Sequence, residues 1–175
     1  MLSAAERQKA GLLKKAAQES RKRLGQNAQS HFGRFLDAYY ANVPPQDIGE
    51  SDPVTLFRLS HGHWKLGAAR AKGKPLIRVF NPEPGKDGWH SERTIIEIIN
   101  DDMPFLVDSV TSELNRQNLT VHLIIHPTLK VRRNKAGKLL DILKGGQRGD
   151  NSVAESFMHL QVSQLSGRRL KGVET

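Results

Sequence analysis

The strongest constraint on the fold lies between residues 94 and 134, where the apolar pattern changes its period twice. Thr94–Asn100, with the sequence TIIEIIN, is β-branched and mostly apolar, which predicts a strand inside a sheet. Residues 103–117 place apolar side chains at helical spacing, which predicts an amphipathic helix. Its buried stripe is expected to hold Phe105, Leu106, Val110 and Leu114. Residues 119–134 then predict one long strand, so this segment is a β-α-β unit.

The pattern after residue 134 extends this unit. KAGK predicts a turn, and the LLDIL that follows can return antiparallel to the long strand. Residues 155–165, ESFMHLQVSQL, alternate in polarity and predict a strand with one dry face. Strand, helix, long strand and strand begin a ferredoxin-like β-α-β-β-α-β module, in which the long strand and the strand at 155–165 would be neighbours.

The predicted fold class is therefore α+β, with N-terminal helices ahead of an incomplete ferredoxin-like module and an antiparallel sheet. The last helix and strand of that module are missing from the pattern. Either the module is completed otherwise, or the chain is an N-terminal piece of something longer, and we favour the second reading.

The pattern divides the chain into four parts. Residues 1–29 are a basic, loosely helical arm, and residues 30–74 are a helical segment. Residues 75–165 are the α+β module, with strands near 75–80, 94–100, 119–134 and 155–165 and a helix near 103–117. Residues 166–175 are a polar tail without a packed element, and the composition of residues 144–152 predicts a flexible linker.

Two helices are expected in the helical segment. Five aromatic and aliphatic residues at three- and four-residue spacing form one stripe before Pro44, namely Phe32, Phe35, Leu36, Tyr39 and Tyr40. Asp52 is expected to cap a second helix, with Pro53 at its first position, that runs to about Ala71.

Charge and composition restrict the function classes. The chain has no cysteine, which excludes thiol catalysis and cysteine-ligated zinc and fits a reducing compartment. No apolar run is long enough to cross a bilayer, and the N-terminus lacks a secretory pattern, so a cytoplasmic location without membrane contact is expected. The net charge of +9 gathers in residues 1–35 and 130–149, each with a net charge of +6. A small basic nucleic-acid-binding module is therefore an alternative, although no aromatic residues interleave with these charges.

Asp101 and Asp102 raise the question of a site at the start of the predicted helix. We interpret both carboxylates as helix caps near the positive end of the helix dipole, with ligand contact as the alternative. No nucleophile or base lies nearby in the sequence, so no catalytic residue is assigned in this chain.

Three histidines are candidates for a metal site. His122 and His126 share one face of the predicted long strand, and His159 lies on the strand predicted beside it. Three imidazoles are enough to hold zinc in principle. We interpret them as polar histidines of the sheet surface and assign no metal; the pair His61 and His63 carries less weight still.

The same residues carry a resemblance to a known family. The segment RVFNPEPGKDGWHSERTIIEIINDDMPFLVDSVTSELNRQNLTVHLIIHP resembles the N-terminal region of the large bacterial NAD-dependent glutamate dehydrogenases, with DDMPFLVDSV and LTVHLIIHP as its most specific parts. FLDAYYANVPPQDI and ESFMHLQV fit the same pattern, so the resemblance covers residues 32–162.

The resemblance implies an ACT-type module with a regulatory or assembly role. The full-length enzyme would convert L-glutamate to 2-oxoglutarate with NAD, and its NAD and catalytic residues would lie outside this chain, which has no cofactor of its own. ACT modules often bind amino acids at the first strand–helix turn, so the implied ligand residues are Asn100, Asp101, Asp102, Met103, Phe105 and Leu106. Phe105 departs from that pattern, because the family usually has glycine directly after the proline, and the departure favours a packing or assembly role.

The implied partners are the rest of the same polypeptide, further copies of the chain and an amino-acid effector. Pairing of copies through a sheet edge would suit the extended strand at 119–134.

Overall fold

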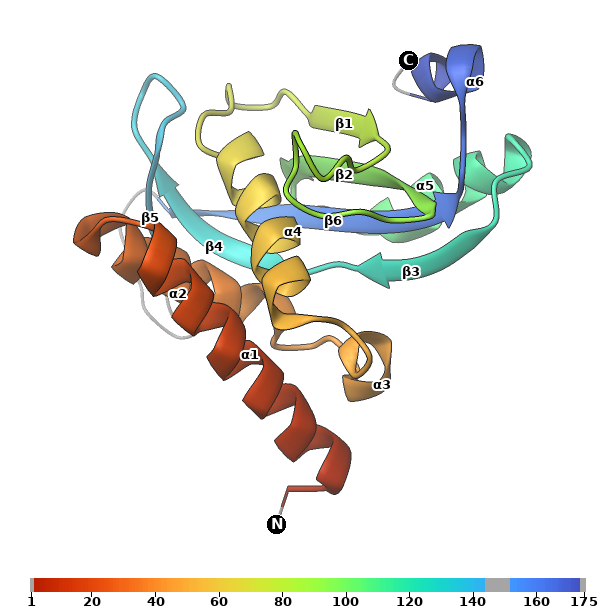
Figure 1. Ribbon diagram of the computed structural model, residues 1–175. Coiled ribbons are helices and arrows are strands. Elements are labelled where there is room, and N and C mark those ends of the chain that lie inside the picture. The colour runs from red at the N-terminus through yellow and green to blue at the C-terminus, as the bar shows by residue number, and fades with distance from the viewer. Residues whose placement is uncertain (1, 144–151, 174–175) are drawn as a thin grey trace.

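The computed structural model describes residues 2–143 and 152–173 (Figure 1). In these ranges the chain forms helices and one antiparallel sheet, which confirms the α+β class. The helices are α1 (Ala4–Arg23), α2 (Gln26–Tyr40), α3 (Pro45–Ile48), α4 (Pro53–Leu66), α5 (Leu106–Arg116) and α6 (Gly167–Gly172). The strands are β1 (Leu76–Phe80), β2 (Arg93–Asp101), β3 (Val121–Ile125), β4 (Thr128–Arg133), β5 (Leu139–Ile142) and β6 (Ser152–Ser163).

The sheet is organised around β6. The strand order is β1-β2-β6-β4-β5, and β3 also pairs with β6. β2 pairs with β6 along its whole length, from Arg93 opposite Ser163 to Asp101 opposite Glu155. The predicted neighbourhood of the long strand and β6 is therefore confirmed, and so is the antiparallel return of β5 on β4.

The predicted long strand over residues 119–134 is divided into β3 and β4. From Leu123 onward both halves follow one register on β6, since Ile125 lies opposite His159 and Thr128 lies opposite Ser156, whereas the register shifts between Val121 and Leu123. Pro127 interrupts the ladder because it has no N–H to donate, although its carbonyl accepts a bond from the Phe157 amide at 3.0 Å. The outer edge of β4 is occupied by β5, so that part of the strand is not a sheet edge.

β1 completes the sheet in an unexpected way. In a β-α-β-β-α-β module the last strand lies antiparallel beside the first. Here β2, α5, β3–β4 and β6 supply the first three strands and the first helix, and β1 lies antiparallel beside β2. The fourth-strand position is therefore filled by β1, which precedes β2, α5, β3–β4 and β6 in the sequence.

One face of the sheet is covered by the N-terminal helices, as Figure 1 shows. The predicted stripe of α2 is confirmed, since each of its five side chains is at most 1% exposed. Ala16 of α1, in the arm predicted to be loosely helical, belongs to the same core. α1 is a regular helix that begins with a capping box, in which Ser3 and Glu6 exchange hydrogen bonds.

The opposite face is covered by α5 and holds an aliphatic core (Figure 1). Met158, Leu160 and Val162 of β6 point to this side, and Leu114 of α5 packs on them. β6 therefore has two buried faces, where the sequence predicted one. The tail also differs from the prediction, because it forms α6 and its Leu170 packs against this core.

α4 begins as predicted and ends early. The Asp52 carboxylate accepts a hydrogen bond from the Thr55 amide at 3.1 Å, and Pro53 occupies the first turn. The helix ends at Leu66 rather than near Ala71. Gly67 follows it because a Cβ there would lie 2.7 Å from the Phe157 ring, so only glycine lets the helix end approach the sheet this closely. The linker predicted at 144–152 lies outside the described residues except for Ser152, which begins β6.

Candidate functional site

The β2–α5 turn, residues 100–106, differs from its predicted geometry. α5 begins at Leu106, and its N-cap is Phe105, which makes no side-chain capping bond. Asp101 is the last residue of β2, and the Asp102 amide donates to the carbonyl of Ala154 at 3.0 Å. The interpretation of both aspartates as helix caps is therefore wrong. The reason is that β2 continues one residue beyond the prediction and the helix starts later.

A buried ionic network fixes this turn instead. Asp101 accepts a hydrogen bond from the Arg70 guanidinium, which also binds Glu155 at 2.8 Å. Arg133 donates two bonds of 2.7 Å to Glu155, whose side chain has no exposed surface. Two carboxylates and two guanidinium groups thus balance in charge, which compensates for the removal of Arg70, Arg133 and Glu155 from water, whereas the Asp101 side chain is 42% exposed. Gly137, at φ +81°, lies so close to the Arg70 carbonyl that a side chain would overlap it.

Residues 102–105 of the turn are exposed. Asp102 accepts a hydrogen bond from the Thr128 hydroxyl at 3.3 Å, Met103 is 47% exposed and Phe105 is 77% exposed. The prediction that Phe105 belongs to the buried stripe of α5 is therefore wrong. Leu106 and Val110 do pack against the aliphatic core, and Leu114 is buried in it. Of the six predicted ligand residues, Asp102, Met103 and Phe105 are therefore exposed. Asn100 and Leu106 are half-buried, and Asp101 is engaged by Arg70.

A second polar cluster, which sequence reasoning did not find, lies between α4 and the sheet. It joins Tyr39 of α2, His63 of α4, Glu97 of β2 and His159 of β6, each at most 1% exposed. The Tyr39 hydroxyl lies 2.9 Å from His63 Nδ1, and His159 Nδ1 lies 3.9 Å from Glu97 Oε1. Arg78 donates to Glu97 at 2.7 and 3.0 Å.

The electrostatics of this cluster favour the neutral form of the His63 imidazole and the charged form of the Glu97 carboxylate. Burial lowers the pKa of His63 to about 4, although Glu97 opposes this shift. Burial alone would raise the pKa of Glu97, but His63, His159 and Arg78 outweigh it and lower that pKa. Burial also raises the pKa of Tyr39, so its hydroxyl stays protonated. Because the groups are closed to solvent, the arrangement can fix the packing of α4 on the sheet, whereas a substrate would reach it only after α4 separated.

One signal in the sequence pointed to this cluster. Glu97 is the single charge inside TIIEIIN, and a carboxylate in a buried strand requires a partner. Its partners come from β1, α4 and β6, and these contacts depend on tertiary structure.

The three candidate metal ligands do not converge. His126 Nε2 lies 2.6 Å from the hydroxyl of Ser156, and His122 Nε2 lies 3.0 Å from that of Ser163. These partners are seven residues apart on β6, which corresponds to roughly 23 Å along a strand. His159 is buried toward α4. Within the described ranges, no three histidine, aspartate or glutamate side chains form a group that could hold a metal.

Two surface cavities lie away from the turn. One, about 210 Å³ in volume, is bounded by α2, α4 and β5 and includes His31, Trp64 and Leu139. The other is an open depression at the end of α5, lined by Thr111, Asn118 and neighbouring residues.

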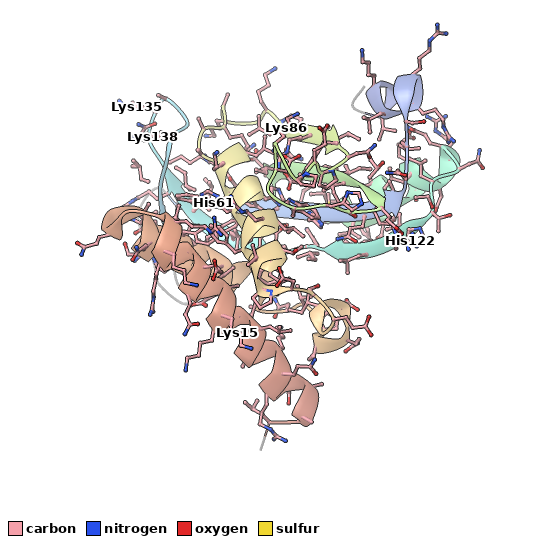
Figure 2. All side chains as sticks on the ribbon, in the orientation of Figure 1. Lys15, His61, Lys86, His122, Lys135 and Lys138 are labelled. Atoms are coloured by element: carbon pink, nitrogen blue, oxygen red, sulfur yellow. The ribbon has the colours of Figure 1, made fainter. Side chains whose placement is uncertain are left out.

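The basic residues are spread over separate elements and partly used within the fold. Figure 2 shows Lys15 on α1 and Lys135 and Lys138 at the turn between β4 and β5. Arg133 is bound to Glu155, and Arg34 binds Asp141 at 2.6 Å. Among the described helices, none has the length and apolar character needed to span a bilayer.

The order of the strands and the β-α-β-β succession define the class as an α+β module consistent with an ACT-like domain. The family follows from comparison with known proteins. A family model described as glutamate dehydrogenase, ACT1 domain, matches residues 35–174. The chain belongs to this family, which confirms the resemblance found in its sequence.

Curated relatives agree with this assignment. The chain is 32% identical to an NAD-specific glutamate dehydrogenase of Pseudomonas aeruginosa over 82% of its own length and 9% of the relative's. It is 31% identical to the enzyme of the same name from Halomonas elongata, over 89% of its length and 10% of the relative's. Mycobacterium tuberculosis has a relative of that name that is 28% identical over 58% of the chain and 6% of the relative. No solved structure matches the chain.

Proposed function

We propose that this chain is a non-catalytic regulatory and assembly segment at the N-terminus of an NAD-dependent glutamate dehydrogenase. The observation that carries the proposal is the family match over residues 35–174, combined with a chain that spans only about a tenth of its relatives' length. The whole enzyme would oxidise L-glutamate with NAD and water to 2-oxoglutarate, ammonia and NADH in the cytoplasm, and NAD would bind outside this chain.

The geometry of the candidate sites supports a non-catalytic role. The Tyr39–His63–Glu97–His159 cluster is buried, so its acid–base groups have no contact with solvent. At the β2–α5 turn, Asp101 is held by Arg70, and the exposed side chains Met103 and Phe105 carry no group that transfers protons.

The size of the native protein tests the proposal. An antibody against this chain should detect, in the source cells, a polypeptide far larger than 19.6 kDa. The immunoprecipitate should reduce NAD when glutamate is added, whereas the purified chain should neither reduce NAD nor bind it. A native band at 19.6 kDa, or turnover by the purified chain, would contradict the proposal.

An amino-acid effector at the β2–α5 turn stays a prediction of the family resemblance. Calorimetric titration of the purified chain with glutamate and aspartate, repeated with an Asp102→Ala variant, tests it. Heat that depends on Asp102 would support sensing at the turn, and flat traces at millimolar ligand would remove this role.

A further inference from the structure

The β2–α5 turn exposes a short apolar segment that the fold does not use. We call Met103, Pro104 and Phe105 the anchor turn; all three are exposed, and Phe105 is 77% exposed. The chain has six phenylalanines, and four of the others are at most 1% exposed while Phe80 is half-buried. A phenylalanine side chain in water gives up the burial that makes this residue favourable elsewhere in the molecule.

The backbone of the anchor turn is unfavourable for this residue as well. Phe105 has φ 62° and ψ 15°, in the left-handed region that bulky side chains rarely adopt. Glycine would remove this strain without loss of a core contact. In this chain alone, Phe105 is therefore unfavourable both for its exposed ring and for its left-handed backbone. Backbone strain of this kind concentrates at functional positions.

The surroundings hold the anchor turn in one conformation. On its N-terminal side, Asp101 is bound by Arg70 and the Asp102 amide is bonded to Ala154. On its C-terminal side, the Ser109 amide donates to the Phe105 carbonyl at 2.9 Å. A rigid aromatic side chain that is already ordered loses little entropy when it binds, which is the property of an interface anchor.

The charge around the anchor turn differs from that of the whole chain. Asp102 and Asp108 are exposed on either side of it, whereas Asp101 is paired with Arg70. The whole chain carries +9. A complementary partner surface would be an apolar pocket bordered by lysine or arginine.

We propose that Met103 and Phe105 dock in an apolar pocket with a basic rim on another part of the same enzyme polypeptide. This inference rests on the proposed function, because the relatives are about ten times longer than this chain and so provide such a partner in cis. A partner in the same chain has a high effective concentration, so two anchoring side chains suffice.

Site-specific cross-linking in the full-length protein tests the docking. Benzoylphenylalanine at position 105 should join, on irradiation, to a peptide of the same polypeptide that contains apolar and basic residues. The matched control places the probe at Leu140, which is 43% exposed on β5 and should not mark that peptide. Mixing light and heavy isotope-labelled copies separates a link within one polypeptide from a link between two. A link to a second copy, to another protein or to no peptide overturns the inference.

A Phe105→Gly variant of the full-length protein separates docking from folding. Hydrogen exchange should accelerate at least tenfold at residues 102–109 while β2 and β6 keep their protection, because the anchor is lost and the fold is not. Equal loss of protection in the sheet would make Phe105 a structural residue and overturn the docking. If the native protein is 19.6 kDa, both proposals fall; if it is large and active but position 105 does not cross-link, only the docking falls.

Discussion

The two faces of the sheet are packed with different kinds of side chain. The face under α1, α2 and α4 is aromatic and contains buried charge, with the rings of Tyr39 and Phe157 packed against His63 of the His63–Glu97–His159 cluster. The face under α5 is aliphatic, and its core cluster in the described residues contains no aromatic ring. Polar groups allow few arrangements, since each needs its partner, whereas aliphatic side chains tolerate rearrangement. The face under α1, α2 and α4, which we call the helical face, therefore specifies how the helices pack on the sheet. The face under α5 carries the exposed β2–α5 turn.

Removal of a buried charge should give the largest difference between the faces. Glu155→Gln leaves Arg70 and Arg133 without their shared carboxylate, so we expect a loss of about 3–5 kcal/mol in the free energy of unfolding. Glu113→Gln on α5, where the ion pair with Arg116 is exposed, is the control and should leave the denaturation midpoint unchanged. Urea denaturation of both variants measures this, and equal midpoints would remove the distinction.

Two adjacent residues of β6 compare the faces directly. Phe157 points to the helical core and Met158 to the aliphatic core, and both are fully buried. Phe157→Ala should lose about 3–5 kcal/mol and Met158→Ala about 2–3 kcal/mol, because the ring leaves the larger cavity. Denaturant titrations measure both losses, and a larger loss for Met158→Ala would reverse the comparison.

Lowering the pH should reduce the free energy of unfolding through His63, which lies on the helical face. The folded pKa of His63 is about 4, below the 6.5 of the unfolded chain, so the unfolded chain binds more protons between these values and stability falls as the pH drops through that window. From pH 7 to pH 5 this contributes a loss of about 2 kcal/mol. A His63→Asn variant should lose less stability than the parent over the same range.

His61→Asn is the matched control for this acid response. His61 lies on the same helix, and burial lowers its pKa to about 4 as well, but it is only about half-buried. His61→Asn should change the pH dependence of the free energy of unfolding less than His63→Asn does. The opposite order would show that the buried cluster does not control acid stability.

The smallest expected loss of stability comes from replacing aspartates at the N-termini of helices. Asp52→Ala removes the cap of α4 and should cost about 1 kcal/mol, whereas Asp102→Ala at the start of α5 should cost at most a few tenths, because Asp102 does not cap that helix. Thermal denaturation compares the two variants. A cost for Asp102→Ala equal to that of Asp52→Ala would restore the interpretation made from the sequence.

Local pattern predicted much of the fold. The α2 stripe and the Asp52 cap follow from spacing and residue type, which depend on nearby residues only. The position of β1 beside β2 does not, because no local pattern states which strand fills a sheet edge. The division of the chain into four parts stays a prediction.

The candidate site was harder to predict. Phe105 has the spacing of a buried helical residue, and only its left-handed backbone turns the side chain outward. Asp101 is of a residue type that commonly caps helices, but its side chain binds Arg70, which lies 31 residues earlier and cannot be identified from local sequence. The His63–Glu97–His159 cluster draws on separate elements, so its assembly depends on the tertiary fold.

The central position of β6 has a consequence for the order of synthesis. β1–β2 and β4–β5 can each pair as soon as they are made, but β6 alone joins these halves, and it is the last strand of the described chain. Until Ser163 has left the ribosome, β2 and β4 each present an unpaired edge that can pair wrongly. A nascent chain interrupted before residue 152 would lack the strand that joins β2 to β4 and the side chains on which α5 packs, and would be a substrate for chaperones or proteases.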